Sequence, residues 1–150
     1  VGASTSNDFA IGFHPNLNSN AKFIISSNTG NVGIGTTNPG IWKLAVNGEI
    51  RAKEIKVETG WSDFVFENTY QLPSLKEVEN HIQQKGHLKD IPSAKEVEEN
   101  GIFLGQMDAK LLQKIEELTL YTIQQQKEIK YLSKKLNELE QKLDKVEKSN

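Results

Sequence analysis

The sequence predicts an elongated α+β protein that combines a short β-strand region, a small helical module and a C-terminal coiled coil. Three observations predict this class: turn-rich apolar runs over residues 1–60, two helix-capping patterns over residues 61–104, and heptad spacing over residues 105–150. Apolar residues make up 36% of the 150 residues, which is a low share for a compact globule. We therefore expect the chain to bury apolar residues against copies of itself.

Short apolar runs separated by turn residues predict strands in the first region. Val32 and Ile34 alternate with glycine, and Leu44 and Val46 flank an alanine, as in the period-two pattern of a strand. The Asn-Gly pair at residues 47–48 predicts a hairpin that joins 44–46 to 49–51. The runs predicted to be strands are 9–13, 22–26, 31–35, 43–46 and 54–57. Because large side chains are sparse here, we expect an apolar stripe that is hidden between chains.

Two Ser-x-x-Glu patterns predict helix starts in the second region, at residues 74–77 and 93–96. The first helix is expected to end at Gly86 and the second at Gly101. This region also holds the densest apolar cluster of the chain, which we interpret as the core of the module, with sugar stacking as the alternative. The cluster consists of Trp61, Phe64, Phe66 and Tyr70.

Apolar residues recur at alternating spacings of four and three through the third region, which predicts a coiled coil of about five heptads. The residues predicted to form its core are Leu111, Ile115, Leu118, Thr122, Gln125, Ile129, Leu132, Leu136, Leu139, Leu143 and Val146. Ile115 occupies an a position and Leu111 a d position. Two flanking g-to-e pairs, 135 with 140 and 142 with 147, have opposite charges. This core composition does not decide between two and three chains.

Two adjacent core layers of this coil are polar. Thr122 and Gln125 either fix the register and the oligomeric state, or mark a loosening of the coil. In the second case, Leu120, Tyr121 and Ile123 would pack outward onto the preceding module.

Several function classes are disfavoured by composition. A net charge of −2 argues against a protein that binds nucleic acid by neutralising phosphates. No apolar run is long enough for a transmembrane helix, no signal peptide is visible, and the absence of cysteine excludes disulfides and thiolate chemistry. Because the chain starts at Val1 and its one methionine is Met107, we expect it to be the C-terminal piece of a longer protein.

The remaining polar residues predict neither a cofactor nor a metal site. His81 and His87 are six residues apart across a predicted helix end, so they do not form a helical ligand pair. Glu116 and Glu117 are adjacent on a predicted helix and point apart, so we expect both on a solvated face.

Longer motifs add a resemblance to a known family. Residues 31–39 (NVGIGTTNP) and 43–50 (KLAVNGEI) resemble the repeat that ends the shaft of phage-type tail fibres and bacterial surface fibres. Residues 61–66, 87–93 and 111–121 resemble the C-terminal block of the same proteins. That block is similar, more distantly, to the endosialidase-type intramolecular chaperone domain.

The resemblance implies an elongated homotrimer with a parallel coiled coil that brings three chains into register and promotes folding of the preceding shaft. The implied partners are two further copies of the chain and the upstream fibre shaft, with a host-surface receptor or glycan as a further option. The implied location is a virion tail fibre, a phage-derived injection device or the cell surface.

Many members of this family also cleave themselves at a serine that begins the domain, with the help of a lysine. Ser62 and Asp63 match that start, but residues 64–68 replace the stretch that carries the lysine, so the general base is missing. We therefore predict a non-enzymatic trimerisation and folding module. The alternatives are a self-cleaving chaperone acting at Ser62 and a receptor- or glycan-binding fibre tip.

Overall fold

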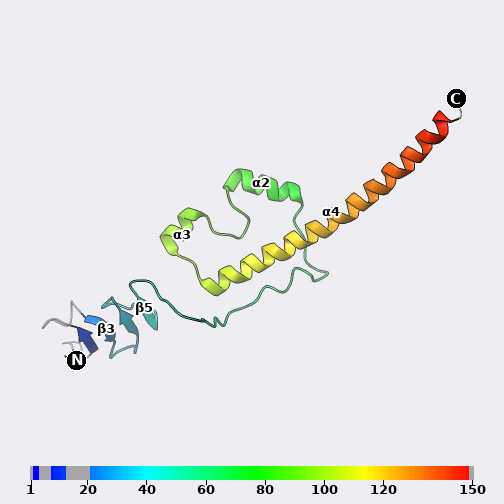
Figure 1. Cartoon of the computed structure of the whole chain (residues 1–150). Helices are drawn as coiled ribbons and strands as arrows, with labels where there is room; N and C mark the ends of the chain where they lie inside the picture. Colours follow the sequence, from blue (N-terminus) through cyan, green and yellow to red (C-terminus); the bar gives the residue numbers. More distant parts are fainter. Residues whose placement is uncertain (1, 4–7, 13–20, 149–150) are drawn as a thin grey trace. The chain divides into compact units, whose positions relative to one another are not determined.

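The computed structural model describes residues 2–3, 8–12 and 21–148, which belong to two compact units, residues 1–55 and residues 56–150 (Figure 1). The first unit contains strands and the second contains helices, so the predicted α+β class is confirmed. None of the helices in these ranges is long and apolar enough to cross a membrane.

The first unit is a five-stranded sheet with the strand order β1-β2-β3-β4-β5. Its strands are β1 (Gly2–Ala3), β2 (Phe9–Gly12), β3 (Ala21–Ile25), β4 (Val32–Ile34) and β5 (Leu44–Val46). The first four strands pair antiparallel, and β5 pairs parallel to β4. Four of the five predicted runs are therefore confirmed as strands, although Phe13 at the end of the first run lies outside the described residues.

The predicted hairpin at residues 47–48 is wrong. Asn47 donates its backbone N–H to the carbonyl of Ile34 at 2.9 Å and its side-chain amide to the carbonyl of Gly35 at 3.3 Å. These bonds extend the parallel pairing with β4, so the chain leaves the sheet after Val46 instead of turning back. The predicted strand at 54–57 is also wrong, because this exposed segment pairs with no described strand.

The register of the sheet places large apolar side chains on one face. Residues directly opposite each other in neighbouring strands point to the same side. Two rows of four follow: Phe9, Ile25, Val32 and Leu44 form one, and Ile11, Phe23, Ile34 and Val46 form the other. The opposite face carries Ala10, Ile24, Gly33 and Ala45. We call the face that carries the two rows of large side chains the apolar sheet face.

Glycine is required at residue 33 on the opposite face because the chain folds closely over this position. A Cβ at Gly33 would collide with the carbonyl oxygen of Thr36 and with the side chain of Ile24. Asn31 is buried and donates its side-chain amide to the carbonyl of Gly40 at 2.8 Å, which holds the following loop in place. The small core of Ala10, Ala21 and Ile24 lies on this side.

The second unit contains α2 (Leu75–Lys85), α3 (Ala94–Asn100) and α4 (Leu104–Glu147). Both capping boxes are formed as predicted, with Ser74 and Glu77 at α2 and with Ser93 and Glu96 at α3. Gly86 caps the end of α2 with a φ of 76°, a left-handed conformation that favours glycine. Neither α2 nor α3 has a buried residue.

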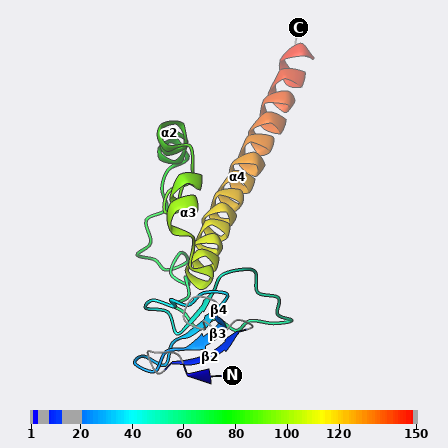
Figure 2. The same cartoon turned by 90° about the vertical axis from the view of Figure 1, so that its left-hand side faces the viewer.

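Helix α4 runs for 44 residues without a break, which corresponds to a length of about 65 Å. Residues 57–73 follow its first half. A Cβ at Gly105 would meet the side chains of Val57 and Thr59 at 2.7 Å, and the hydroxyl of Tyr121 donates to the carbonyl of Pro73 at 2.5 Å. Helices α2 and α3 lie beside the same half of α4 (Figure 2).

Candidate oligomerisation interface

The first half of α4 is covered by its own chain on one side only. Its buried residues are Gly105, Ala109, Glu116 and Glu117. With Ile115 at an a position, Ala109 and Glu116 occupy b positions and Glu117 a c position. These positions lie on the outer side of a coiled coil, away from the seam of a and d residues. The preceding module, residues 57–100, therefore packs on the side of α4 that carries the b and c positions, which we call its outer face.

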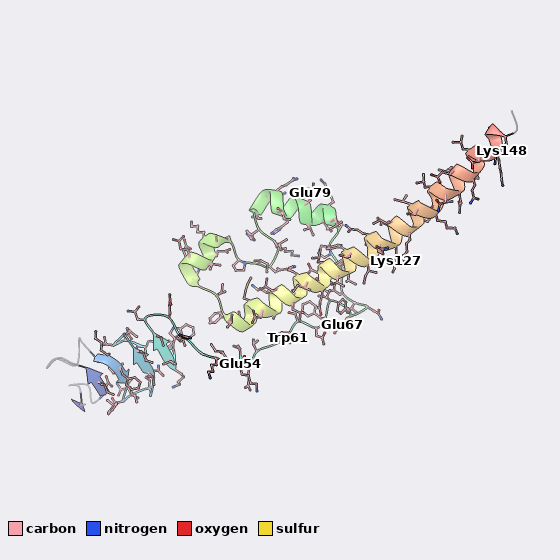
Figure 3. The ribbon with its side chains drawn as sticks, viewed as in Figure 1. Glu54, Trp61, Glu67, Glu79, Lys127 and Lys148 are labelled. Carbon is pink, nitrogen blue, oxygen red and sulfur yellow. The ribbon has the colours of Figure 1, made fainter. Side chains whose placement is uncertain are left out.

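The seam of α4 is uncovered along its whole length. We call the eleven core residues predicted from the heptads the heptad face, and every one of them is exposed. The exposed fraction is 61% for Ile115, 63% for Leu132 and 59% for Leu143. Beyond Lys127, no other segment among the described residues of the unit lies beside the helix (Figure 3). One helix with such a stripe is not stable alone in water, because its apolar face stays hydrated.

The two polar layers of the heptad face differ in their hydrogen bonding. The hydroxyl of Thr122 donates to the carbonyl of Leu118 at 2.8 Å, within the same helix. The hydroxyl of Thr122 is therefore paired within its own helix, and its methyl group remains available for packing. Gln125 lines a cavity between α4 and the start of α2. Of the residues that would pack onto the preceding module if the coil were loosened here, Tyr121 donates a hydrogen bond to the carbonyl of Pro73, whereas Ile123 is 47% exposed.

A polar cluster fastens the module to the outer face of α4. Glu117 accepts hydrogen bonds from the Tyr70 hydroxyl at 2.5 Å, from the Gln113 amide at 2.9 Å and from the Lys114 ammonium group at 3.0 Å. We call these four residues the Glu117 cluster. Lys114 also lies 3.8 Å from the carboxylate of Asp90. Residues 70 and 90, which lie in separate loops, are thus held to one turn of α4.

The environment of this cluster shifts two pKa values. Burial raises the pKa of the Glu117 carboxyl, but the hydrogen bonds from Tyr70, Lys114 and Gln113 outweigh it and leave the pKa below 4.5. Burial, together with the hydrogen bond to Glu117, raises the pKa of Tyr70 to about 12. Glu117 therefore stays ionised and Tyr70 stays neutral at physiological pH.

The expectation that Glu116 and Glu117 lie on a solvated face is wrong. Glu116 is 8% exposed and Glu117 is 5% exposed. One carboxylate oxygen of Glu116 is buried without a hydrogen-bond partner among the described residues. The pairing of Glu117 depends on Tyr70, which is 47 residues away in the chain. The spacing of the acidic residues contains no signal for such a contact.

The Glu117 cluster makes the stability of the helical unit depend on pH. A carboxyl whose pKa is lowered by folding stabilises the protein above pH 4.5, and this stabilisation is lost as the pH falls through the folded-state pKa. Replacing Glu117 with Gln is expected to cost roughly 3 kcal/mol at pH 7, because the ammonium of Lys114 loses its carboxylate partner at 3.0 Å and keeps only Asp90 at 3.8 Å. The same variant should lose less stability than the wild type between pH 7 and pH 3.

Thermal unfolding followed by circular dichroism at both pH values measures this difference. Glu77 and Glu96 contribute to the wild-type pH dependence, since hydrogen bonds with their capping serines lower the pKa of each. Glu98→Gln is the matched control, because Glu98 is exposed. An equal loss of stability in Glu117→Gln and Glu98→Gln would contradict the role of the cluster.

The four aromatics expected to form the module core do not do so within one chain. Trp61 is 65% exposed, Phe66 58% and Phe64 40%. The rings of Phe64 and Tyr70 are in contact, with centroids 5.7 Å apart. A turn closed by the bond from the Glu67 N–H to the Phe64 carbonyl directs the intervening Val65 inward, where it is 2% exposed. Val65 thus takes the buried position, and its neighbours remain at the surface.

The candidate cleavage residues and histidines form no described catalytic or metal centre. Ser62 is 9% exposed, whereas Asp63 is exposed. The rings of His81 and His87 lie edge to face, with centroids 5.7 Å apart. The described ranges contain no group of three or more His, Asp or Glu side chains that could hold a metal ion.

The apolar sheet face is a second uncovered apolar surface. Four of its eight residues are exposed, with fractions of 44% for Phe9, 40% for Ile11, 41% for Ile34 and 53% for Leu44, and the other four are half-buried. The alternation in each strand suggested an apolar stripe. The stripe becomes a continuous surface only through the pairing register, which sequence analysis did not provide.

The chain shows no significant similarity to any protein-family model, curated protein or solved structure in the three comparisons made.

Proposed function

We propose that the chain is a non-enzymatic trimerisation and folding module at the C-terminus of a tail-fibre or surface-fibre protein. The observation that supports this most strongly is the division of α4 into two faces. The outer face binds the module of the same chain, and the heptad face carries nine apolar residues that this chain leaves exposed. Burying one such Leu, Ile or Val side chain contributes about 1.5–3 kcal/mol. Further copies of α4 are the partners whose shape fits this face.

Charges beside the seam favour parallel helices in register. In a parallel coil, each g residue meets the e residue five positions further along the next chain, which pairs Lys135 with Glu140. An antiparallel coil would bring g residues against g residues and e residues against e residues. The pairing of Lys135 with Glu140 would then be lost.

The proposed number of three chains follows from the fibre-like motifs. The sheet supports self-association through an independent observation. A single sheet with one apolar face of eight large residues needs a cover. In an assembly of three chains, three apolar sheet faces can enclose a common core. Pairing between chains over long loops is slow and prone to aggregation, whereas a helix forms locally. The coil would therefore align the chains before the sheets associate.

The native mass of the chain tests this proposal directly. Light scattering behind size exclusion is expected to give three times the chain mass of 16.8 kDa. A mass of one chain would contradict the proposal, because the heptad face would then have to be covered by its own polypeptide.

A further inference from the structure

Helix α2 leaves two large apolar side chains exposed over about half of their surface. Leu75 is 52% exposed and Ile82 is 43% exposed, and no residue of α2 is buried. A cavity of about 550 Å³ separates the start of α2 from α4. Its wall on the side of α4 is formed by Tyr121, Gln124, Gln125 and Glu128. The helix is thus held at its first turn but does not pack against α4.

The heptad positions of this wall show on which side of α4 the helix lies. Tyr121 and Glu128 are g residues, Gln124 is a c residue, and Gln125 is a d residue. Helix α2 therefore lies beside the g flank of its own α4, at the level of residues 121–128. In a parallel coil, the g flank of one helix meets the e flank of the next, and the b positions lie just outside that e flank.

The next copy presents an exposed aliphatic residue at this place. Ile123 occupies a b position at the level of the cavity and is 47% exposed. It is the one aliphatic residue of α4 beyond Leu120 that lies outside the heptad face. Since α2 lies on the g side of its own α4, it leaves the Ile123 of its own chain uncovered. Ile123 and the cavity thus lie on opposite flanks of the same α4. In a parallel coil, the cavity of one chain would therefore lie next to Ile123 of the neighbouring chain.

We propose that α2 of each copy packs Leu75 against Ile123 of the next copy, which partly fills the cavity of the first. This inference rests on the parallel coil of the proposed function. Each module would then hold its own α4 through the Glu117 cluster and the neighbouring α4 through α2. Three such contacts close a ring, in which every module joins two chains.

Disulfide trapping between chains of different size tests the contact. The chain has no cysteine, so each introduced thiol is unique. A chain carrying Leu75→Cys and an added tag is co-expressed with an untagged chain carrying Ile123→Cys, and the purified assembly is oxidised. The expected product on a denaturing gel is a band that contains one tagged and one untagged chain. Either single variant alone should give only the unlinked chain.

A seam control separates the failure of this inference from the failure of the proposed function. Leu139→Cys lies at a d position and should link two chains under the same oxidation. Suppose that Leu139→Cys forms a disulfide between chains and the native mass is three chains, but that no mixed band forms. The α2 contact is then wrong, and the parallel coil is still supported. A disulfide within one chain of the Leu75→Cys, Ile123→Cys double variant would also overturn the contact. A one-chain mass without a seam link would overturn both.

Discussion

Replacing Ile129 and Leu132 with aspartate is expected to convert the proposed three-chain assembly into single chains. Both side chains belong to the heptad face, and in one chain they are 57% and 63% exposed. If the face stays in water, two aspartates there change stability by no more than about 0.5 kcal/mol each. If it lies in a coil, each layer must bury carboxylates from every chain, at a cost of several kcal/mol per charge. Light scattering distinguishes the two cases.

The matched control places the same charges on the outer face. Asn137 and Gln141 occupy b and f positions and are exposed, so Asn137→Asp together with Gln141→Asp gives the same net charge without touching the seam. This control should keep the native mass. A native mass in the Ile129→Asp, Leu132→Asp variant would show that the heptad face is not the interface.

Replacing Ile34 with aspartate is expected to unfold the sheet unit while the proposed coil keeps the chains together. Ile34 lies opposite Phe23 on the apolar sheet face and is 41% exposed in one chain. An exposed site tolerates this change, whereas a site enclosed between sheets loses apolar burial and gains a buried charge, for a loss of about 4 kcal/mol or more. Amide hydrogen exchange should show lost protection in β2–β4 with unchanged protection in α4.

Thr37→Asp is the control for this variant, since Thr37 is exposed and lies in a loop close to Ile34 in the sequence. Its exchange pattern should match that of the wild type. Retained protection of the strands in Ile34→Asp would mean that the apolar sheet face faces solvent in the assembly.

Local interactions account for what the sequence could predict. The two capping boxes fixed the starts of α2 and α3, because the hydroxyl of Ser74 and the carboxylate of Glu77 meet within one turn. The predicted heptad region, residues 105–150, agrees with α4 (Leu104–Glu147) to within a few residues, since spacing along one helix is also a local property. Alternation likewise identified β4 and β5.

Contacts between distant segments account for what the sequence could not predict. The parallel pairing of β5 with β4 depends on a loop that folds over the sheet and is held by Asn31. The Asn-Gly pair at residues 47–48 carries no information about this loop, and by itself it predicts a hairpin. The burial of Glu117 depends on Tyr70 and Lys114, and the exposure of Phe66 depends on a single turn. The heptad spacing identifies one apolar stripe along α4, but the side of the helix that the module covers is shown only by the structure.

The outer contacts of α4 are confined to its first half, and this leaves the second half free to vary in length. The buried residues of the helix lie between Gly105 and Glu117, and the hydroxyl of Tyr121 makes the last described bond to the module. Seven residues complete nearly two turns and restore the phase of the stripe. Whole heptads could therefore be gained or lost after residue 128 without disturbing the module. The strength of the proposed self-association would thus be set by the length of one helix, independently of the fold that the helix carries.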